Sequence, residues 1–532
     1  MNHSRRALGV SILVVWLGLC FIGELNAQRE MIVLFHTQSS VHFAQRSPQQ
    51  GLRFLRSLGI RHNLALYEVD TSSVDTNALL AWVRHQPEVK AAQWNGEVSF
   101  RETPDDPFFF NQWDMDIIQA PDAWEHTTGG QTATGVPIVV AVMDSSFDTA
   151  HEDIRENLWY NEAETPDDNV DNDGNGYVDD RLGWDYFSNT PHIAPGDHGL
   201  SITGIIGASG NNGKGVAGIN WNLQMMLFSF NQIADLMQAY EYVIDQRMRF
   251  NETNGAAGAF VVAANHSFGV NNTLCDNYPV WQAMLDHLGE AGVLSSAGVA
   301  NTRYNVDISG DTPATCPSDY LIVSCNTDAD DNLYTSSAYG PVSVDMGSPG
   351  EASYTVKPAG TYGLFGGNSA ATPHVTGAIA LLYSANVQVL TQQAIQQPAA
   401  TARLIRDVLI RGVEQTPSLQ NRTATGGRLN LANALSLLLD NYNSEPGPLA
   451  MTIVFPNPVT DKVMVRFVVP EYGTYEARLY NTLGQLVSQK TVIAEVNTIL
   501  LFDMAVASLP AGAYQLQFGK GSTWVQQMVV KL

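Results

Sequence analysis

Basic residues are scarce in this 532-residue chain: 28 Lys and Arg stand against 53 Asp and Glu, giving a formal net charge of −25 at pH 7. Proteins that bind nucleic acid neutralise its phosphates with clustered Lys and Arg. The shortage of these residues therefore argues against nucleic acid as a partner. Charge balance says little about fold. A hydrophobic share of 45% with 15% charged residues indicates a folded protein, and the length predicts several domains.

Long apolar runs are also missing once the first 27 residues have passed, so no later segment is expected to span a bilayer. The N-terminus itself has two arginines, an apolar run over 7–21 and the tripeptide Leu25-Asn26-Ala27. This order predicts a secretory signal peptide over residues 1–27. A membrane anchor is the alternative, but the run is short for a span. Lipid attachment at Cys20 is disfavoured because no small residue directly precedes it.

Cysteine is the third scarcity, with four in the whole chain. Export would place Cys275, Cys316 and Cys325 in an oxidising compartment. Three pairings are possible, and the sequence alone does not choose among them. We favour a Cys275–Cys316 disulfide because both lie in loop-like sequence with Pro or Asn nearby. Cys325 ends an apolar run and is expected to pack as a small hydrophobe.

One stretch is the starting point for interpreting the rest of the chain. In it, two glycines and Asn368 precede Ser369, and small residues then lead into a long apolar helical run. Pro373 is placed just inside the expected helix start, where a proline is tolerated. The N-terminus of a helix offers spare N–H groups and a favourable dipole to developing negative charge. A serine placed there suits a nucleophile, although small residues before a helix often serve packing alone.

A serine nucleophile needs a histidine base that a carboxylate orients. The run 136–143 predicts a buried strand with Asp144 at its exit, and His198-Gly199 opens a second apolar run. The order Asp144, His198, Ser369 is that of subtilisin. With their flanking residues, these three blocks resemble the signature segments of subtilisin-like serine peptidases (the S8 family) over residues 105–440.

The resemblance implies further site residues. Asn301 resembles the family's oxyanion asparagine, although Ala300 replaces the usual glycine before it, and Asn305 is a nearby rival. The residues that resemble the substrate-lining segments of the family are Ser267, Phe268, Gly269 and Gly298. They would pair with an extended peptide and line the pocket for the side chain at the cleaved bond.

Two further departures flank the nucleophile and the base: Asn368 stands where the family usually has Thr, and Leu200 to Ile202 differ from the usual block after the histidine. Neither departure removes a catalytic group. Other histidines lie near the motifs. We expect His151 to be structural, His192 to lack the context of a catalytic base, and His374 to pack within its helix.

An acidic segment over 167–180 lengthens the span between the expected aspartate and histidine. Oxygen-bearing residues alternate around glycines in it, which suits a Ca²⁺ ion and resembles the first part of an EF-hand loop. The distant glutamate of that motif is missing. The predicted ligands are Asp171, Asp173, Asn175, Tyr177, Asp179 and Asp180, of which the last two are the candidates for closing the loop.

Residues 28–101 alternate strand and helix patterns: strands over 31–35, 64–69 and 89–93, and helices over 49–58 and 76–85. The resemblance places an inhibitory and chaperoning propeptide here, with its junction after Arg101. An ordinary α+β domain kept in the mature protein is the alternative. Residues 102–440 form the predicted peptidase domain, an α/β fold with a parallel sheet and helices on both faces.

A linker is predicted over 441–450, and short strands with period-two alternation follow over 451–532, which predicts a β-sandwich. Its Pro456-Asn457-Pro458 start and Leu483-Gly484-Gln485 turn resemble the sorting domain of the type IX secretion system. This resemblance implies export through the periplasm to the outer cell surface or beyond, and contact with that machinery. A generic binding sandwich is the alternative.

The sequence thus predicts a secreted, calcium-stabilised serine endopeptidase made as a zymogen, with polypeptides as substrates and its own propeptide as inhibitor. A catalytically inactive surface adhesin or scaffold of the same fold is the alternative from another class, and an esterase or peptide ligase using the same site is a third.

Overall fold

The computed structural model describes residues 28–36, 43, 51–59, 63–70, 76–96, 103–443, 450–455, 457–468, 473–494, 499–521 and 523–532. The predicted signal peptide, the junction around Arg101 and residues 444–449 of the predicted linker lie outside them. The chain divides into two compact units, Met1–Phe100 and Arg101–Leu532.

In the described residues, the first unit is an antiparallel four-stranded sheet against which helix α2 packs. Its elements are β1 (Gln28–Phe35), β2 (Leu52–Ser57), β3 (Leu64–Asp70), α2 (Thr76–Arg84) and β4 (Val89–Trp94). The order in the sheet is β2-β3-β1-β4. Fully buried Met31, Val33 and Tyr67 lie on one face of β1 and β3, and Val83 of α2 belongs to the same core. Buried and more exposed positions alternate along the strands, which is the pattern expected of a sheet that packs one face against a core.

The predicted helix over 49–58 is wrong. Residues 52–57 form strand β2, which pairs antiparallel with β3 and carries an irregularity between Phe54 and Arg56. That irregularity breaks the period-two pattern by one residue, so the spacing of apolar residues imitates a helix. Phe54 packs edge-on against Tyr67 at 5.7 Å between ring centroids, and this tertiary contact favours the strand.

A nine-stranded sheet forms the centre of the second unit, in the order β16-β17-β13-β12-β10-β8-β5-β7-β6. Its strands are β5 (Val139–Asp144), β6 (Gly183–Asp185), β7 (Gln224–Ser229), β8 (Val261–His266), β10 (Leu294–Gly298), β12 (Leu321–Thr327), β13 (Met346–Pro349), β16 (Glu414–Gln415) and β17 (Gly427–Arg428). All neighbours pair parallel except β16 with β17. The predicted α/β architecture is confirmed.

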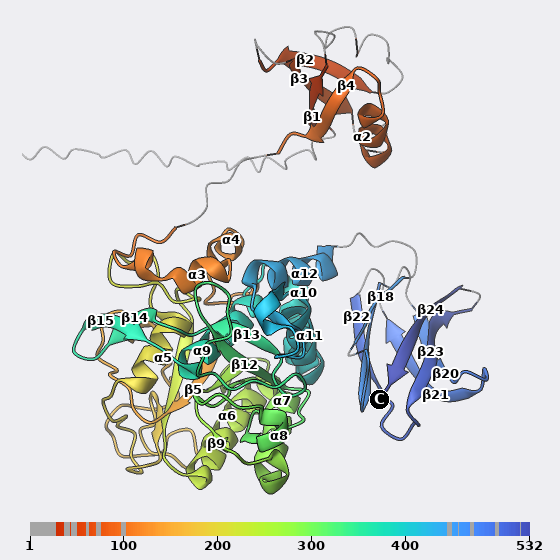
Figure 1. Ribbon diagram of the computed structural model, residues 1–532. Helices are drawn as coiled ribbons and strands as arrows, with labels where there is room; N and C mark the ends of the chain where they lie inside the picture. Colours follow the sequence, from red (N-terminus) through yellow and green to blue (C-terminus); the bar gives the residue numbers. More distant parts are fainter. Residues whose placement is uncertain are drawn as a thin grey trace, which may run out of the picture. The chain divides into compact units, whose positions relative to one another are not determined.

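Helices cover both faces of this sheet (Figure 1). The remaining helices are α3 (Trp113–Ile117), α4 (Ala120–Trp124), α5 (His198–Gly207), α6 (Ile233–Thr253), α7 (Pro279–Ala291), α8 (Val306–Ser309), α9 (Asn368–Tyr383), α10 (Gln388–Gln396), α11 (Pro398–Arg411) and α12 (Leu431–Asn443). Along β5, Val140 and Val142 join the core beneath α5 and α9. Ala141 and Met143 join the core beneath α6 and α7. Within the described part of the chain, no helix has the length and apolarity to cross a membrane.

Two short pairings complete this region. β9 (Val270–Asn271) pairs with β11 (Asp311–Thr312), and β14 (Ser353–Lys357) pairs with β15 (Thr361–Phe365), both antiparallel. β9 lies shortly after β8 and β11 shortly after β10. Because neighbouring parallel strands end at the same edge, the segments that leave β5, β8 and β10 lie together there.

The C-terminal part is a β-sandwich of two antiparallel sheets, as expected from its alternating sequence. One sheet contains β18 (Ala450–Phe455), β19 (Lys462–Val468) and β22 (Ile499–Ala505). The other contains β20 (Gly473–Tyr480), β21 (Leu486–Ala494), β23 (Gly512–Lys520) and β24 (Thr523–Lys531). Phe467 of the first sheet stacks on Phe518 of the second. Helix α12 extends to Asn443, so the first three residues of the predicted linker are helical.

Candidate active site

A histidine and an aspartate are paired at the carboxyl end of strand β5. Asp144 is the last residue of β5, and His198 is the first residue of α5. Nδ1 of His198 lies 2.9 Å from Oδ1 and 2.8 Å from Oδ2 of Asp144. The backbone N–H of Ser145 also donates to Oδ1 at 2.7 Å. The carboxylate is buried, whereas the imidazole is 42% exposed, so the ring is anchored on one side and open on the other.

Burial lowers the pKa of His198, but the hydrogen bond to Asp144, the charge of that carboxylate and the charge of Asp197 outweigh burial, so the pKa is raised above the ordinary 6.5. Lys357 opposes this rise from its ion pair with Asp197 at 3.1 Å. A histidine in such a setting accepts a proton readily and holds it as an imidazolium.

Gly199 explains how α5 comes so near β5. A Cβ at this position would meet Cε1 of Phe147 at 2.5 Å, the Ser146 carbonyl at 2.6 Å and Cβ of Asp144 at 2.9 Å. Any side chain would therefore push the helix away and lengthen the contact between His198 and Asp144. The glycine after His198 is therefore required for α5 to pack close enough to β5 for His198 to contact Asp144.

The other histidines have structural partners or an exposed position. His374 is fully buried, with Nε2 3.0 Å from Oδ2 of Asp114 and Nδ1 2.8 Å from the Ala370 carbonyl. His151 contacts the Thr361 carbonyl through Nε2 at 3.1 Å. His192 lies exposed in a loop. These placements agree with the interpretation of their sequence context.

Ser369 is the second residue of α9, a 16-residue helix. Gly367 precedes the helix with a φ of +86°, and a Cβ there would lie 2.8 Å from Oδ1 of Asn301. Glycine is thus required for both backbone shape and space. Among the described residues, no hydrogen bond joins the Ser369 hydroxyl to His198. Such bonds are often long in a site without substrate.

Asn301 is oriented by the start of α9. Its Oδ1 accepts hydrogen bonds from the backbone N–H of Asn368 at 2.7 Å and from the Asn368 amide at 3.0 Å. These two bonds hold the Asn301 amide against the start of α9. Asn305 is placed differently, because it caps α8 by accepting from the N–H of Asp307 at 2.9 Å. The structure therefore brings Asn301, not Asn305, to Ser369.

Asn368, which departs from the family pattern, is a buried cross-link. Its Nδ2 donates to the Ala300 carbonyl at 2.9 Å, and its Oδ1 accepts from the N–H of Asn326 at 2.8 Å and from the Ser337 hydroxyl at 3.0 Å. The side chain thus ties α9 to the segment after β10 and to β12. These hydrogen bonds fix the start of α9, where Ser369 lies, to its neighbours.

A cavity of about 180 Å³ opens beside Ser369. It is lined by Ser267, Phe268, Gly269, Asn271, Gly298, Val299, Ala300, Asn301, Thr302, Asp311, Asn368 and Ser369. All four predicted substrate-lining residues are among them. The Ser267 hydroxyl donates to the Ser369 carbonyl at 3.1 Å, and Phe268 packs against Phe230 at 4.8 Å between centroids. Asp311 was not predicted from the sequence as a residue of this site, because it lies in no recognisable motif.

Comparison with known proteins matches residues 135–427, more than half of the chain, to the subtilase family. The chain belongs to the subtilase family. Residues 453–531 match the secretion system C-terminal sorting domain. Both matches confirm the resemblances stated from the sequence.

Individual relatives of this subtilase are distant. Subtilisin-like protease 1 of Plasmodium berghei (strain Anka) is 24% identical over 369 residues, which cover 63% of this chain and 56% of the relative. Thermitase of Thermoactinomyces vulgaris is 28% identical over 293 residues, covering 53% and 86%. A solved protease structure from Pseudoalteromonas arctica PAMC 21717 is 22% identical with a TM-score of 0.46, covering 63% and 100%. The subtilase spans about half the length of the Plasmodium relatives named subtilisin-like protease 1.

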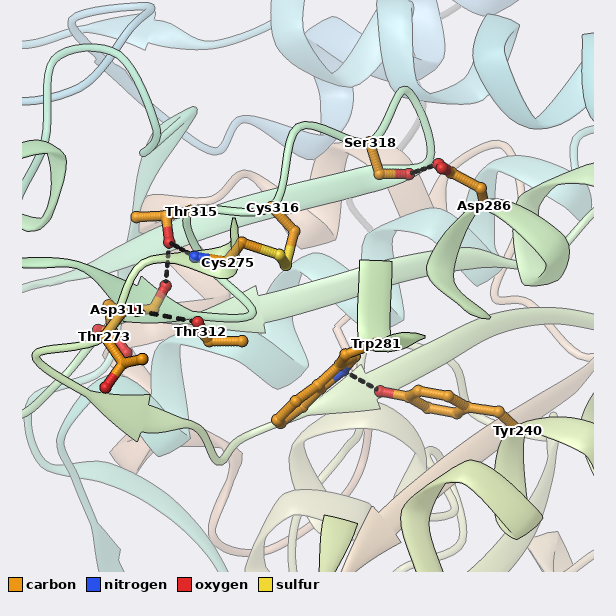
Figure 2. Close-up of a disulfide and its surroundings, with 10 residues drawn as sticks. All are labelled: Tyr240, Thr273, Cys275, Trp281, Asp286, Asp311, Thr312, Thr315, Cys316 and Ser318. Carbon is orange, nitrogen blue, oxygen red and sulfur yellow. Dashed lines mark hydrogen bonds between the residues drawn. A yellow bond between two sulfur atoms is a disulfide. The ribbon is translucent and has the colours of Figure 1, made fainter. Parts of the chain in front are cut away.

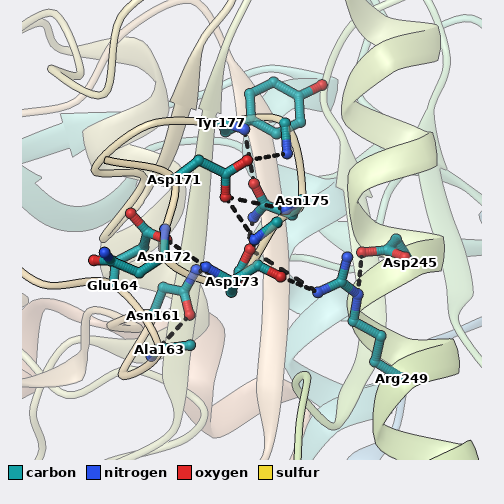
Figure 3. Close-up of polar contacts among 12 residues, drawn as sticks. Asn161, Ala163, Glu164, Asp171, Asn172, Asp173, Asn175, Tyr177, Asp245 and Arg249 are labelled. Carbon is teal, nitrogen blue, oxygen red and sulfur yellow. Dashed lines mark hydrogen bonds and ion pairs between the residues drawn. The ribbon is translucent and has the colours of Figure 1, made fainter. Parts of the chain in front are cut away.

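The acidic segment of the subtilase folds into a tight loop (Figure 3). Oδ1 of Asp171 accepts from the N–H groups of Gly174 and Asn175 at 2.7 and 3.1 Å, and Oδ2 accepts from Gly176 at 2.9 Å. Oxygens of Glu164, Asp171 and Asp173 lie within 4.8 Å of one another. Glu164 was not predicted as a ligand, because it lies before the acidic run.

Asp179 and Asp180, the two candidates for closing the loop, make different contacts. Asp180 is buried, and it accepts from the Asn175 amide at 2.7 Å and from the Tyr242 hydroxyl. Burial raises its pKa to about 6. The Asp179 carboxylate instead accepts from the N–H groups of Asp168 and Asn169 at 3.2 and 3.1 Å. Asp180 is thus linked to Asp173 through the amide of Asn175, and Asp179 supports the preceding turn.

Tyr177, another predicted ligand, turns its ring away from the acidic cluster. Its hydroxyl accepts from the hydroxyl of Tyr186 at 3.0 Å, and its ring packs edge-on against Trp184 at 5.0 Å between centroids. Its backbone N–H donates to the side chain of Asn175 at 2.8 Å. The side chain therefore belongs to the aromatic core beside the loop.

Cys275 and Cys316 form a disulfide with a Cα–Cα distance of 5.0 Å, and Cys325 is a buried free thiol. This is the pairing that the loop composition favoured. Figure 2 shows that the disulfide lies beside Thr315 and Asp311, on the segment that contributes to the cavity. Burial raises the pKa of Cys325 to about 12, so this thiol is unreactive.

Proposed function

We propose that this chain is a secreted serine endopeptidase that cleaves polypeptides through Asp144, His198 and Ser369. The observation that supports it most is the hydrogen-bonded Asp144–His198 pair at the carboxyl end of β5. Its imidazole is open to solvent on the side away from the carboxylate. The family membership and the cavity beside Ser369 agree with this proposal.

In the first step, Oγ of Ser369 attacks the carbonyl carbon of the scissile peptide bond while His198 Nε2 takes the hydroxyl proton. Asp144 accepts from Nδ1–H and stabilises the imidazolium. The C–N bond then breaks, and His198 returns its proton to the leaving amine. Water attacks the resulting ester, again with His198 as the base, and Ser369 is regenerated.

The carbonyl oxygen becomes an oxyanion in both steps. Asn301 Nδ2–H and the backbone N–H of Ser369 would donate to it. The hold of Asn368 on Oδ1 fixes the Asn301 amide before substrate arrives, which is the condition under which such donors lower a barrier most. The spare N–H groups at the start of α9 add a favourable dipole.

An extended peptide would pair with the backbone of Ser267 to Gly269 by β-augmentation. The side chain before the cleaved bond would then enter the cavity between Gly269 and Gly298. A backbone-paired strand recognises a peptide better than an ester, which favours the peptidase over an esterase that uses the same site.

We further propose that the acidic loop binds Ca²⁺. The donors are carboxylate oxygens, the ligands that calcium prefers, and three carboxylates are close enough to share one ion. Glu164, Asp171, Asp173 and Asp180 would hold the ion, with Asn175 nearby. Calcium would neutralise carboxylates whose mutual repulsion is only partly offset by Arg249, 3.9 Å from Asp173. Its role would be structural.

The remaining parts complete a secreted zymogen. The first unit, within residues 28–101, would inhibit and help fold the peptidase. Residues 102–440 would be the enzyme, and residues 451–532 would bind the type IX secretion machinery. Export would run through the periplasm to the outer surface, after removal of residues 1–27. The match to the sorting domain supports this route.

Labelling with a fluorophosphonate tests the catalytic proposal. The processed wild-type chain should react at Ser369, and Ser369→Ala should not. Because labelling needs a neutral imidazole, its rate should rise with pH through a midpoint above 6.5, the ordinary pKa of histidine that His198 exceeds. Processed wild type that is folded but never labelled would instead support the adhesin or scaffold alternative.

A further inference from the structure

A carboxyl group lies in the cavity beside Ser369. Asp311 is among the lining residues, yet it is only 2% exposed. Its Oδ2 accepts from the backbone N–H of Ala300 at 2.7 Å. Its Oδ1 lies 3.4 Å from where a Cβ of Gly269 would be. The absence of a side chain at Gly269 therefore leaves this oxygen accessible from the cavity.

The backbone holds Asp311 firmly in this position. β11 pairs with β9 so that Asp311 lies opposite Asn271. The Asp311 carbonyl accepts from the N–H of Thr315 at 2.7 Å and from its hydroxyl at 2.8 Å. Thr315 in turn accepts from the N–H of Cys275 at 3.2 Å, next to the disulfide (Figure 2). The carboxyl is thus part of a built pocket wall and not of a free loop.

Asp311 has no cationic partner within the described part of the chain. Arg303 is near in sequence, but its guanidinium lies over the ring of Tyr339. Burial raises the pKa of Asp311 to about 7, and the bond from Ala300 opposes this rise. A buried carboxylate without a counter-charge is costly, so a positive group that enters the pocket would stabilise the ionised form of Asp311.

We propose that Asp311 makes this pocket select a basic side chain, Lys or Arg, on the residue whose carbonyl Ser369 attacks. This inference rests on the proposed peptidase function. A cation entering between Gly269 and Gly298 would form a charge-assisted hydrogen bond with Oδ1 of Asp311. An apolar side chain of similar size would cover the carboxyl without pairing it and would be rejected for that reason.

The chain itself offers a candidate substrate of this chemistry, at the predicted end of the propeptide. The predicted end of the propeptide falls after Arg101, which would present a guanidinium to the pocket during processing. Mature protein should then begin at Glu102, as N-terminal sequencing can determine. Arg101→Leu should slow this cleavage in the wild-type background and have a much smaller effect when Asp311 is replaced.

Peptides that differ only at the residue before the cleaved bond give the direct test. Wild type should cleave the Lys and Arg peptides with kcat/KM at least about tenfold above the Leu and Phe peptides. Asp311→Asn keeps an acceptor for the Ala300 N–H but carries no charge, and it should lose this preference. Asp276→Asn is the matched control, since Asp276 is exposed and lies outside the cavity.

The pH dependence of the preference needs no variant. The ratio of kcat/KM for Lys over Leu peptides cancels the common dependence on His198. It should rise with pH through about 7, as Asp311 ionises, and stay flat in Asp311→Asn. Fluorophosphonate labelling separates the two proposals. A labelled enzyme that prefers Leu or Phe, or whose ratio is unchanged by Asp311→Asn, overturns the role of Asp311 alone. A chain that is never labelled overturns both.

Discussion

At the scale of single residues, the proposed role of Asn301 in stabilising an oxyanion can be tested. Asn301→Ala removes one donor while leaving Asp144, His198 and Ser369 in place. We expect turnover to fall by about 10²–10³, with little change in KM, because the amide would act on the transition state and not on bound peptide. Steady-state kinetics on one peptide measures the split. Asn305→Ala is the matched control, since it removes a helix cap away from the cavity.

A comparable loss of turnover in Asn305→Ala with none in Asn301→Ala would reverse the assignment. An equal rise in KM and fall in kcat/KM, with kcat unchanged, would mean that Asn301 binds substrate only.

The residues that depart from the family pattern, Asn368 and Ala300, can also be considered at the scale of single residues. Asn368 and Ala300 contact each other through the Asn368 amide and the Ala300 carbonyl. Ala300 also donates its N–H to Asp311. The two unusual residues therefore connect the start of α9 to the carboxyl in the cavity. They leave the three proposed catalytic side chains in place.

At the scale of elements, substitutions in the acidic loop can distinguish the proposed calcium ligands from residues that only support the turn. We expect Glu164→Gln and Asp171→Asn each to weaken calcium binding by about tenfold or more, because each removes a charged ligand from the cluster. Asp179→Asn should bind calcium nearly as wild type, since its carboxylate supports the turn at Asp168. Calorimetric titration of the Ser369→Ala chain, which cannot digest itself, measures all three.

If Asp179→Asn abolished binding while Glu164→Gln did not, the closing ligand would be Asp179 and the cluster around Glu164 would be structural. Absence of calcium binding in the parent chain would contradict the calcium proposal as a whole.

Strand β2 shows how an element can mislead when its sequence is considered alone. Its apolar residues Leu52 and Leu55 are three apart, as on a helix face. In the structure, an irregularity next to Leu55 shifts the pairing with β3. Only the partner strand, with Tyr67 placed to contact Phe54, selects the extended form.

For the molecule as a whole, the buried acids determine how stability follows pH. Burial raises the pKa values of Asp106 and Asp180 to about 6 and that of Asp311 to about 7. The folded state therefore binds more protons than the unfolded state between about pH 4 and pH 7. Stability from these groups is present at low pH and is lost as pH rises through 6 to 7. The raised pKa of His198 acts in the same direction.

We accordingly expect the melting temperature of calcium-free Ser369→Ala chain to fall between pH 5 and pH 8. Added calcium should reduce this fall, because it favours the ionised loop. Thermal unfolding across this pH range, with calcium removed by a chelating resin or restored, measures both effects. Asp180→Asn should flatten part of the calcium-free slope. A melting temperature that rises with pH in the absence of calcium would contradict the expected direction.

The sequence by itself determined the architecture and the three proposed catalytic positions. These positions could be found because their sequence patterns are local. The patterns are the strand exits, the His198-Gly199 pair and the small residues around Ser369. Each of them satisfies a packing or backbone requirement of its own segment. The order of the blocks then placed them in one fold. The disulfide partners could be favoured from loop composition, although the choice among three pairings stayed open.

Only the tertiary structure decided what lies across from these residues. Asp311 carries no motif and enters the cavity because β11 pairs with β9. Glu164 joins the acidic loop because the chain turns back onto it. Asn301 is distinguished from Asn305 by the helix start that holds its oxygen. In each case the deciding interaction joins residues distant or unpatterned in sequence, so it exists only once the chain has folded and brought them together.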